Sequence, residues 1–215
     1  MKKLITFIFC VTTSWFFVQA QPGIRLSGYA TYAFDDRVDS YYSDEAYFDG
    51  TLKGGFEYGG GLEFMLHEAY GFELLYLRMD SKAPMEYWNG GVQHSTFNVA
   101  SNYIMAGGNR YILTDKKIEP YGGLLIGMTV FGVENPDNGN YGTATKFAWG
   151  IRLGANIWAS EKVGLKIQAG LLSAVQAIGG GLFFGTGGAG AGISALSTFY
   201  QFNIGGGLVF NVRSK

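Results

Sequence analysis

Cysteine is almost absent from this chain of 215 residues, and histidine and proline are rare. The single cysteine, Cys10, lies in an apolar N-terminal stretch that we predict is removed, which leaves a mature protein without disulfide bonds or thiol chemistry. His67 and His94 are the only histidines, too few for most metal sites and catalytic triads. The sequence therefore predicts no catalytic residue, no metal site and no cofactor.

Charged residues are also scarce, at 15% of the chain, and the formal net charge is −1. This balance excludes the basic surface of a nucleic-acid-binding protein. Hydrophobic residues make up 47%, which excludes a disordered chain. Glycine is abundant: its 34 residues among 215 are roughly double the usual share of about 7%. Aromatic residues make up 16% of the chain. With only four prolines, this composition fits closely curved strands.

The first twenty residues, 1–20, are predicted to be a secretory signal peptide. Lys2 and Lys3 form its charged start, the apolar stretch ends at Val18, and Ala20 closes a small-residue cleavage site. An uncleaved helical anchor is the alternative, but the apolar stretch is shorter than the ~20 residues that a span needs. Cleavage leaves residues 21–215 as one barrel domain with 14 basic and 17 acidic groups, a net charge of −3.

Past Gln21 the apolar residues repeat with a period of two, which predicts β-strands. Eight segments show the pattern: 24–34, 56–66, 72–76, 97–105, 124–130, 147–157, 163–171 and 202–210. Because charges occur singly on the opposite faces, we expect the apolar faces to meet lipid. In the fourth segment this lipid face would consist of Phe97, Val99, Tyr103 and Met105.

The connections between these segments alternate in length. Long connections, at 35–53, 80–95, 134–145 and 175–195, alternate with short ones at 67–69, 114–117 and 160–162. We therefore predict an all-β fold, an eight-stranded antiparallel transmembrane β-barrel with short periplasmic turns and long extracellular loops. The segment 96–113 is too long for one crossing, so it either projects beyond the bilayer or bends at Gly107-Gly108.

Loose glycine-spaced patterns give the chain a family resemblance. They are Gly71-Phe72-Glu73-Leu74, Pro120-Tyr121-Gly122-Gly123-Leu124 and Phe202-Asn203-Ile204-Gly205-Gly206-Gly207-Leu208-Val209-Phe210. With these patterns, residues 21–213 resemble the small outer-membrane β-barrel proteins related to the OmpA transmembrane domain and OmpX, especially the porin-like barrels of Bacteroidetes. The resemblance implies an integral outer-membrane protein that is inserted by the barrel-assembly machinery and contacts outer-membrane lipid and lipopolysaccharide.

Six charged residues are expected to face the inside of the barrel: Arg25, Glu57, Glu63, Glu73, Arg152 and Lys166. An eight-stranded barrel is just wide enough for side chains, so three acids and three bases are expected to pair and plug it. Glu73 is expected to pair with Arg152, with Lys166 as the alternative partner. A gated pathway for ions or protons is the alternative reading of the same residues.

The first long connection, 35–53, is acidic. Its acids are Asp35, Asp36, Asp39, Asp44, Glu45 and Asp49, opposed only by Arg37 and Lys53, which gives a net charge of −4. These carboxylates could hold a calcium ion that bridges to lipopolysaccharide, or contact an extracellular protein. They follow no ordered calcium-loop spacing, so a solvated loop is the alternative.

The last long connection, 175–195, is unusually apolar. Leu182, Phe183 and Phe184 stand among glycines and alanines, where an exposed loop is expected to be polar. Either the flanking strands run higher and pair 182–184 with 192–196, or the segment covers the barrel mouth, dips into the membrane or binds an apolar ligand. A spanning helix over 171–196 is a further alternative, but eight glycines oppose it.

The sequence predicts a non-enzymatic outer-membrane barrel that acts in surface binding, adhesion or envelope integrity through its extracellular loops. A narrow porin-like channel for small solutes is the main alternative. A lipid-modifying enzyme is less supported, because in His94-Ser95-Thr96 the serine follows the histidine directly, whereas the barrel lipid A deacylases use a His-x-Ser motif.

Overall fold

The computed structural model describes residues 23–43, 46–88, 92–114, 117–137, 139–175, 182–185, 188–191 and 199–213. The predicted signal peptide, 1–20, lies outside them. Across these ranges, no helix has the length and apolar character needed to cross a membrane.

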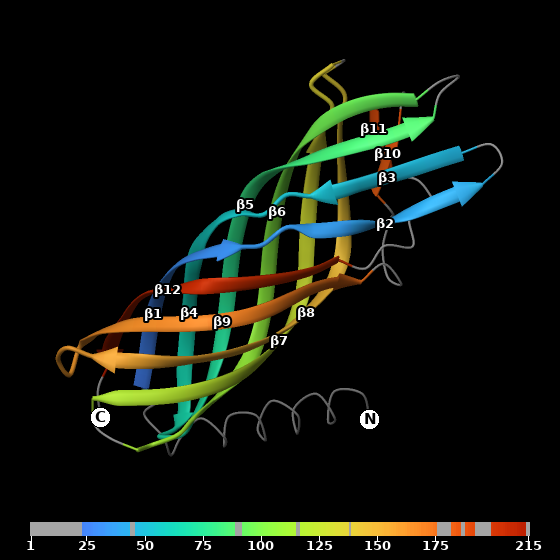
Figure 1. Cartoon of the computed structure of the whole chain (residues 1–215). Coiled ribbons are helices and arrows are strands. Elements are labelled where there is room, and N and C mark those ends of the chain that lie inside the picture. The colour runs from blue at the N-terminus through green and yellow to red at the C-terminus, as the bar shows by residue number, and fades with distance from the viewer. Residues whose placement is uncertain are drawn as a thin grey trace, which may run out of the picture.

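Eight antiparallel strands form the wall of a closed barrel (Figure 1). They are β1 (Gly23–Ala33), β4 (Gly55–His67), β5 (Tyr70–Trp88), β6 (Val92–Tyr111), β7 (Ile118–Glu134), β8 (Tyr141–Trp158), β9 (Val163–Val175) and β12 (Phe199–Arg213). Each strand pairs with the next, and β12 closes the wall by pairing with β1, where Leu208 stands opposite Gly28. Closure satisfies the backbone hydrogen-bonding groups that a sheet edge would expose to lipid. The predicted eight-stranded barrel is confirmed.

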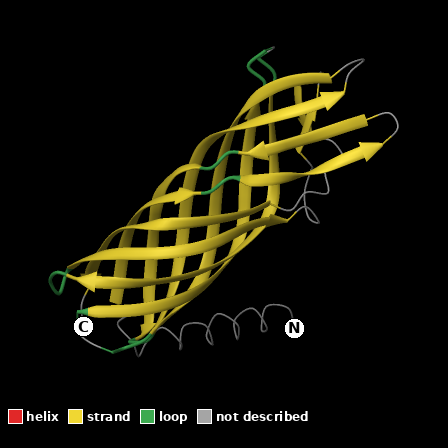
Figure 2. Ribbon diagram, viewed as in Figure 1, coloured by secondary structure: helices red, strands yellow, loops and turns green. Residues whose placement is uncertain are grey.

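The connections leave the barrel with two unlike ends. At one end, which we name the short-turn end, β4 passes to β5 through Glu68 and Ala69, and β8 passes to β9 through residues 159–162. At the other, the long-loop end, the wall rises well beyond the ends of β1 and β4, and most of the described residues there are in strands (Figure 2). The predicted short turns therefore lie together at one end of the barrel.

Much of what the sequence predicts as long loops is strand. Within 35–53, β2 (Asp36–Ser43) and β3 (Ala46–Leu52) form a hairpin, and β3 pairs with β5. The predicted loop 80–95 is wrong, because β5 and β6 pair continuously until only residues 89–91 separate them. That pairing has no register shift at Gly107-Gly108, so β6 projects instead of bending.

The apolar segment 175–195 also contains strands. β10 (Leu182–Gly185) pairs with β11 (Gly188–Ala191) in a separate two-stranded sheet, in which Leu182 stands opposite Ala191 and Phe184 opposite Ala189. The expected pairing of 182–184 with 192–196 is therefore wrong. The helical alternative is wrong as well, because residues 171–175, 182–185 and 188–191 are strands.

The outer wall carries a broad band of exposed apolar side chains, which we name the apolar belt. It includes Leu26, Tyr32, Phe72, Leu74, Tyr76, Ile104, Leu124, Ile126, Met128, Ile151, Leu153, Leu165, Ile167, Phe202, Ile204 and Leu208. So much exposed hydrocarbon is unfavourable in water and favourable against lipid tails. The belt matches the faces predicted for seven of the eight segments.

The predicted face of β6 is wrong. Phe97, Val99, Tyr103 and Met105 are buried inside the barrel, and Ile104 lies on the outside. Two apolar clusters fill the interior. The middle cluster contains Tyr29, Leu75, Leu77, Tyr103, Met105, Leu125, Ala148 and Leu172. The rim cluster contains Leu52, Ala83, Met85, Phe97, Val99, Phe131, Val133, Ala144 and Ala174. Where the wall leaves the belt and meets water, burial inside the barrel stabilises apolar side chains as in a soluble protein.

Candidate functional site

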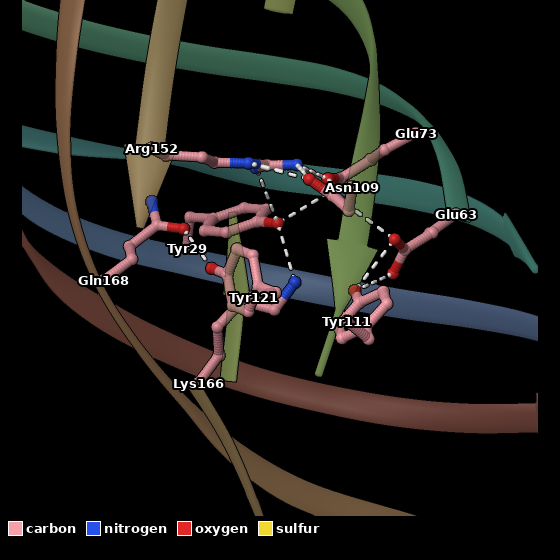
Figure 3. Close-up of polar contacts among 9 residues, drawn as sticks. All are labelled: Tyr29, Glu63, Glu73, Asn109, Tyr111, Tyr121, Arg152, Lys166 and Gln168. Atoms are coloured by element: carbon pink, nitrogen blue, oxygen red, sulfur yellow. Dashed lines mark hydrogen bonds and ion pairs between the residues drawn. The ribbon is translucent and has the colours of Figure 1, made fainter. Parts of the chain in front are cut away.

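A polar layer crosses the inside of the barrel (Figure 3). It lies between the short-turn end and most of the middle cluster. At its centre Arg152 of β8 forms an ion pair with Glu73 of β5, and both side chains are buried. Arg152 also donates from Nη2 to Oδ1 of Asn109 at 2.8 Å and from Nη1 to the hydroxyl of Tyr29 at 3.3 Å. The guanidinium therefore has a charge partner and neutral acceptors, the conditions that make a buried cation tolerable.

Tyr29 connects the ion pair to Lys166. Its hydroxyl donates to Oε1 of Glu73 at 2.5 Å and accepts from Nζ of Lys166 at 3.1 Å. The ammonium of Lys166 also lies 5.2 Å from the ring centroid of Tyr29 and 5.1 Å from that of Tyr121. Tyr121 in turn donates to Oε1 of Gln168 at 2.8 Å. Lys166 is thus held by a hydroxyl and two aromatic faces.

Glu63 extends the same layer toward the short-turn end. Its Oε1 accepts from Nδ2 of Asn109 at 2.7 Å, and its Oε2 accepts from the hydroxyl of Tyr111 at 2.7 Å. Since Asn109 also donates to Oε2 of Glu73 at 3.1 Å, one amide links both glutamates and Arg152. The layer is one continuous hydrogen-bonded network, not a set of separate pairs.

Glycines on the inner wall make room for this layer. A Cβ atom at Gly61 would lie 2.0 Å from Oε1 of Glu73, and one at Gly71 would lie 2.2 Å from Oε1 of Glu63. A Cβ at Gly123 would lie 2.3 Å from Oδ1 of Asn109. These three glycines therefore have a local cause, because small inward residues are needed beside the large polar ones.

Arg25 finds a partner that the sequence analysis missed. It pairs with Glu119, whose Oε2 lies 3.0 Å from Nη1 of Arg25, and the guanidinium lies 5.0 Å from the ring of Tyr111 and 5.1 Å from that of Trp158. Glu119 stands directly before Pro120, close to the start of β7, and lies between the predicted connection 114–117 and the predicted segment 124–130. The sequence feature that could have identified this partner is an acidic residue close to the aromatic residue at the start of a strand.

The six predicted lumen residues are all buried inside the barrel. Only Glu73 and Arg152 form an ion pair with each other, while Glu63 and Lys166 join the same network through neutral groups. Glu57 stands apart and accepts from Oγ1 of Thr31 at 2.8 Å and Nδ2 of Asn203 at 3.3 Å. The expected pairing of three acids with three bases among themselves is therefore wrong. Lys146, a further buried cation, was also missed.

Side chains occupy the interior at successive levels: the polar layer, the middle cluster and the rim cluster. These hydrogen-bonded charges and apolar clusters contact several strands at once and so hold the wall together. Ions would have to displace buried, hydrogen-bonded charges to pass, which costs several kcal/mol for each group left unpaired, roughly 3–5 by analogy with buried ion pairs.

An open cleft of about 800 Å³ lies at the long-loop end. Its lining includes Arg37, Asp49, Glu86, His94, Ser95 and Asp137. Asp49, Glu86 and His94 stand in one row across β3, β5 and β6, and Nδ1 of His94 lies 3.5 Å from Oε2 of Glu86. Ser95 donates to Oδ2 of Asp137 at 2.6 Å, and Arg37 lies 3.4 Å from Asp49. Three carboxylates face one arginine and one histidine, so the cleft carries an excess of negative charge and acceptors.

The acidic residues of 35–53 are dispersed by the hairpin. Asp35 accepts from Nζ of Lys53 and from the backbone N–H of Gly54, both at 2.8 Å, and these contacts hold the pKa of its carboxyl below the ordinary value. Asp36 accepts from the backbone N–H of Tyr200 at 2.7 Å, and Asp49 lies in the cleft.

The remaining predicted loop residues are only partly described. Asp39 lies in β2, but its side chain is outside the described part, as are residues 44 and 45, so the predictions for Asp44 and Glu45 stay untested. Leu182, Phe183 and Phe184 are described in backbone only, as β10. Among the residues whose side chains are described, no group of acids or histidines is arranged to hold a metal ion.

Comparison with known proteins places the fold. No protein-family model and no curated protein matches the chain. The crystal structure of Neisserial surface protein A (NspA) matches with a TM-score of 0.56 at 13% identity, over 87% of this chain and 96% of that one. The outer membrane protein OprG from Pseudomonas aeruginosa matches with a TM-score of 0.56 at 11% identity, over 90% and 97%. The chain is similar in fold to small eight-stranded outer-membrane β-barrels.

Proposed function

We propose that this protein is an integral outer-membrane barrel that binds molecules outside the cell through its long-loop end. The apolar belt would lie in the bilayer, the short-turn end would face the periplasm, and the projecting parts of β5 to β8 would stand in the external medium. The two structural neighbours, a surface protein and an outer membrane protein, support this location.

The observation that carries the proposal is the contrast between the interior and the long-loop end. The interior holds a hydrogen-bonded polar layer and two apolar clusters, while the long-loop end is an extended wall with an open cleft. A transport channel needs a continuous polar pathway, and a binding protein needs an accessible surface. The open cleft at the long-loop end provides such an accessible surface, and this favours binding over transport.

The chemistry of the cleft indicates the kind of ligand. Asp49, Glu86 and Asp137 provide carboxylate oxygens, and only Arg37 is permanently cationic among the charged residues that line it. Electrostatic complementarity therefore favours a cationic ligand, and a cleft open to one side suits a lysine- or arginine-rich segment of an extracellular protein. Such binding is expected to weaken as salt screens the charges.

A binding experiment tests the proposal. The refolded protein in lipid nanodiscs is titrated with a fluorescent oligolysine peptide at low and physiological salt, and compared with a double variant, Glu86→Gln with Asp137→Asn. The matched control is Glu68→Gln with Glu161→Gln, which removes two carboxylates at the short-turn end. We expect the cleft variant alone to lose binding. Equal binding by all three proteins would contradict the proposed site.

A further inference from the structure

A second hollow lies on the outside of the wall, where β5 to β8 rise beyond the apolar belt. It has a volume of about 430 Å³, and its lining includes Arg78, Lys82, Asn98, Glu134 and Tyr141. It is separate from the cleft at the long-loop end, because the two share no lining residue. We name it the wall groove.

The sequence creates the wall groove by placing small residues between large ones. Ala100 and Gly132 stand opposite each other in the pairing of β6 with β7 and form the floor. The next outward row toward the long-loop end runs through Lys82, Asn98, Glu134 and Tyr141. The row on the other side runs through Arg78, Asn102 and Val130. Large side chains therefore surround a floor that is formed by the small residues Ala100 and Gly132.

Tyr141 forms one side of the groove. A Cβ atom at Gly132 would lie 2.5 Å from the hydroxyl oxygen of Tyr141, so the tyrosine ring reaches over the glycine. Tyr141 is nevertheless 66% exposed. The groove thus presents an aromatic ring to any molecule that lies in it.

The groove opens where the apolar belt ends. The next outward residues toward the short-turn end are Tyr76, Ile104 and Met128, all exposed members of the belt. The hydroxyl of Tyr76 donates to Oδ1 of Asn102 at 2.9 Å, so a single pair joins the belt to the polar wall. In a bilayer this height corresponds to the headgroups of the outer leaflet.

The charges of the groove balance. Arg78 is oriented by Asp80, which accepts from Nη2 at 2.7 Å and from Nε at 3.1 Å, and Asn102 accepts from Nη1 at 3.3 Å. Lys82 and Glu134 add one further charge of each sign. A bare phosphate is recognised by a surplus of cations, whereas hydroxyl groups both donate and accept and therefore suit a site that offers both. Together with the exposed ring of Tyr141, this set matches a sugar.

We propose that the wall groove binds the sugar headgroup of an outer-leaflet glycolipid whose acyl chains lie along Tyr76, Ile104 and Met128. The continuity of the groove with the apolar belt selects a membrane lipid over a soluble saccharide, because one molecule contacts both surfaces. Binding of this kind fixes the height and tilt of the barrel in the leaflet, independently of the cleft at the long-loop end.

Native mass spectrometry tests the proposal with purified rough-type lipopolysaccharide as the probe. Ala100→Trp fills the floor of the groove, and Ala106→Trp makes the same change on the same strand inside the apolar belt. We expect the unsubstituted protein and Ala106→Trp to retain the glycolipid, and Ala100→Trp to bind it at least about tenfold more weakly, a loss of about 1.4 kcal/mol. Asn98→Ala with Glu134→Ala, which adds no bulk, is expected to weaken binding in the same direction.

Competition separates the possible sources of binding. We expect the oligosaccharide released from the same lipopolysaccharide to displace it, and phosphatidylethanolamine in mixed detergent micelles and inorganic phosphate to leave it bound. Retention of the glycolipid by both groove variants would overturn the proposal, as would equal displacement by phosphatidylethanolamine, which would assign the binding to the belt alone. Displacement by phosphate but not by the oligosaccharide would overturn the sugar assignment. None of these outcomes depends on binding at the cleft.

Discussion

Arg152 on β8 forms an ion pair with Glu73 on β5 inside the barrel, although the two residues are 79 positions apart in the chain. Their exposed fractions are 4% and 0%, so water screens neither charge. A buried charge that loses its partner is far more costly than one that keeps it. The pair therefore couples two strands that are not neighbours in the wall.

This coupling predicts non-additive effects in a double-mutant cycle. Glu73→Ala and Arg152→Ala are each expected to lower the free energy of unfolding by roughly 3–5 kcal/mol, and the double variant by clearly less than their sum. Urea unfolding of the refolded protein in lipid vesicles measures all three. Additive losses would contradict a direct pairing and would make Lys166, reached through Tyr29, the partner of Glu73.

The glycines beside the polar layer give a second prediction. Gly61→Ala would place a methyl group against Glu73 and Tyr29, and is expected to destabilise the barrel by roughly 1–3 kcal/mol through overpacking. Gly28→Ala is the matched control, because a Cβ there meets nothing within 4 Å. Urea unfolding in lipid vesicles measures the stability of both variants. Equal stability of the two variants would mean that the inner wall is not packed as described.

Closure of the barrel predicts heat-modifiable migration on a denaturing gel. Without a free sheet edge in the wall, detergent has no place at which to begin separating strands, so the unboiled protein is expected to keep its fold and migrate differently from the boiled sample. Identical migration of a properly refolded sample before and after boiling would count against a closed wall.

The contact between Asp35 and Lys53 predicts a pH dependence at the start of the β2–β3 hairpin. The pKa of Asp35 is below its ordinary value of 3.8 because Lys53 and the N–H of Gly54 donate to the carboxylate. The stabilisation is therefore complete above that value and disappears as the pH falls through the lower pKa of the folded state. NMR titration of the carboxyl carbon is expected to show the low pKa, and Lys53→Ala is expected to raise it. Lys162→Ala, distant in the fold, should leave it unchanged, and a shift equal to that of Lys53→Ala would contradict the contact.

The strands of the apolar belt could be predicted from sequence because one rule governs them. Residues such as Ile151, Leu153 and Ile204 alternate with inward small or polar residues, and the lipid requires an apolar outer face on every strand. The rule fails above the belt. Met79, Ala83 and Met85 point inward there while Asp80, Lys82 and Glu86 point outward, the reverse arrangement, and the sequence pattern therefore predicts a loop at 80–95.

The contacts of the interior residues are harder to predict from sequence than the fact that these residues are buried. That Glu73, Arg152 and Lys166 lie inside follows from the period of two, which fixes the face of each residue. Which group each one contacts depends on the stagger of the strands around the barrel. Stagger brings Glu119 to Arg25 and Tyr29 to Lys166, and no local pattern in the chain records it.

A conductance recording tests the central claim, that the interior is closed and that the protein acts at its long-loop end. The refolded protein is inserted into a planar bilayer of phosphatidylethanolamine and phosphatidylglycerol, and current is measured across a range of voltages in potassium chloride, with a large general porin as the positive control. We expect insertion, verified by protease protection of the barrel, without sustained channel openings. A stable ohmic conductance from the unsubstituted protein would contradict the account and establish transport through the barrel.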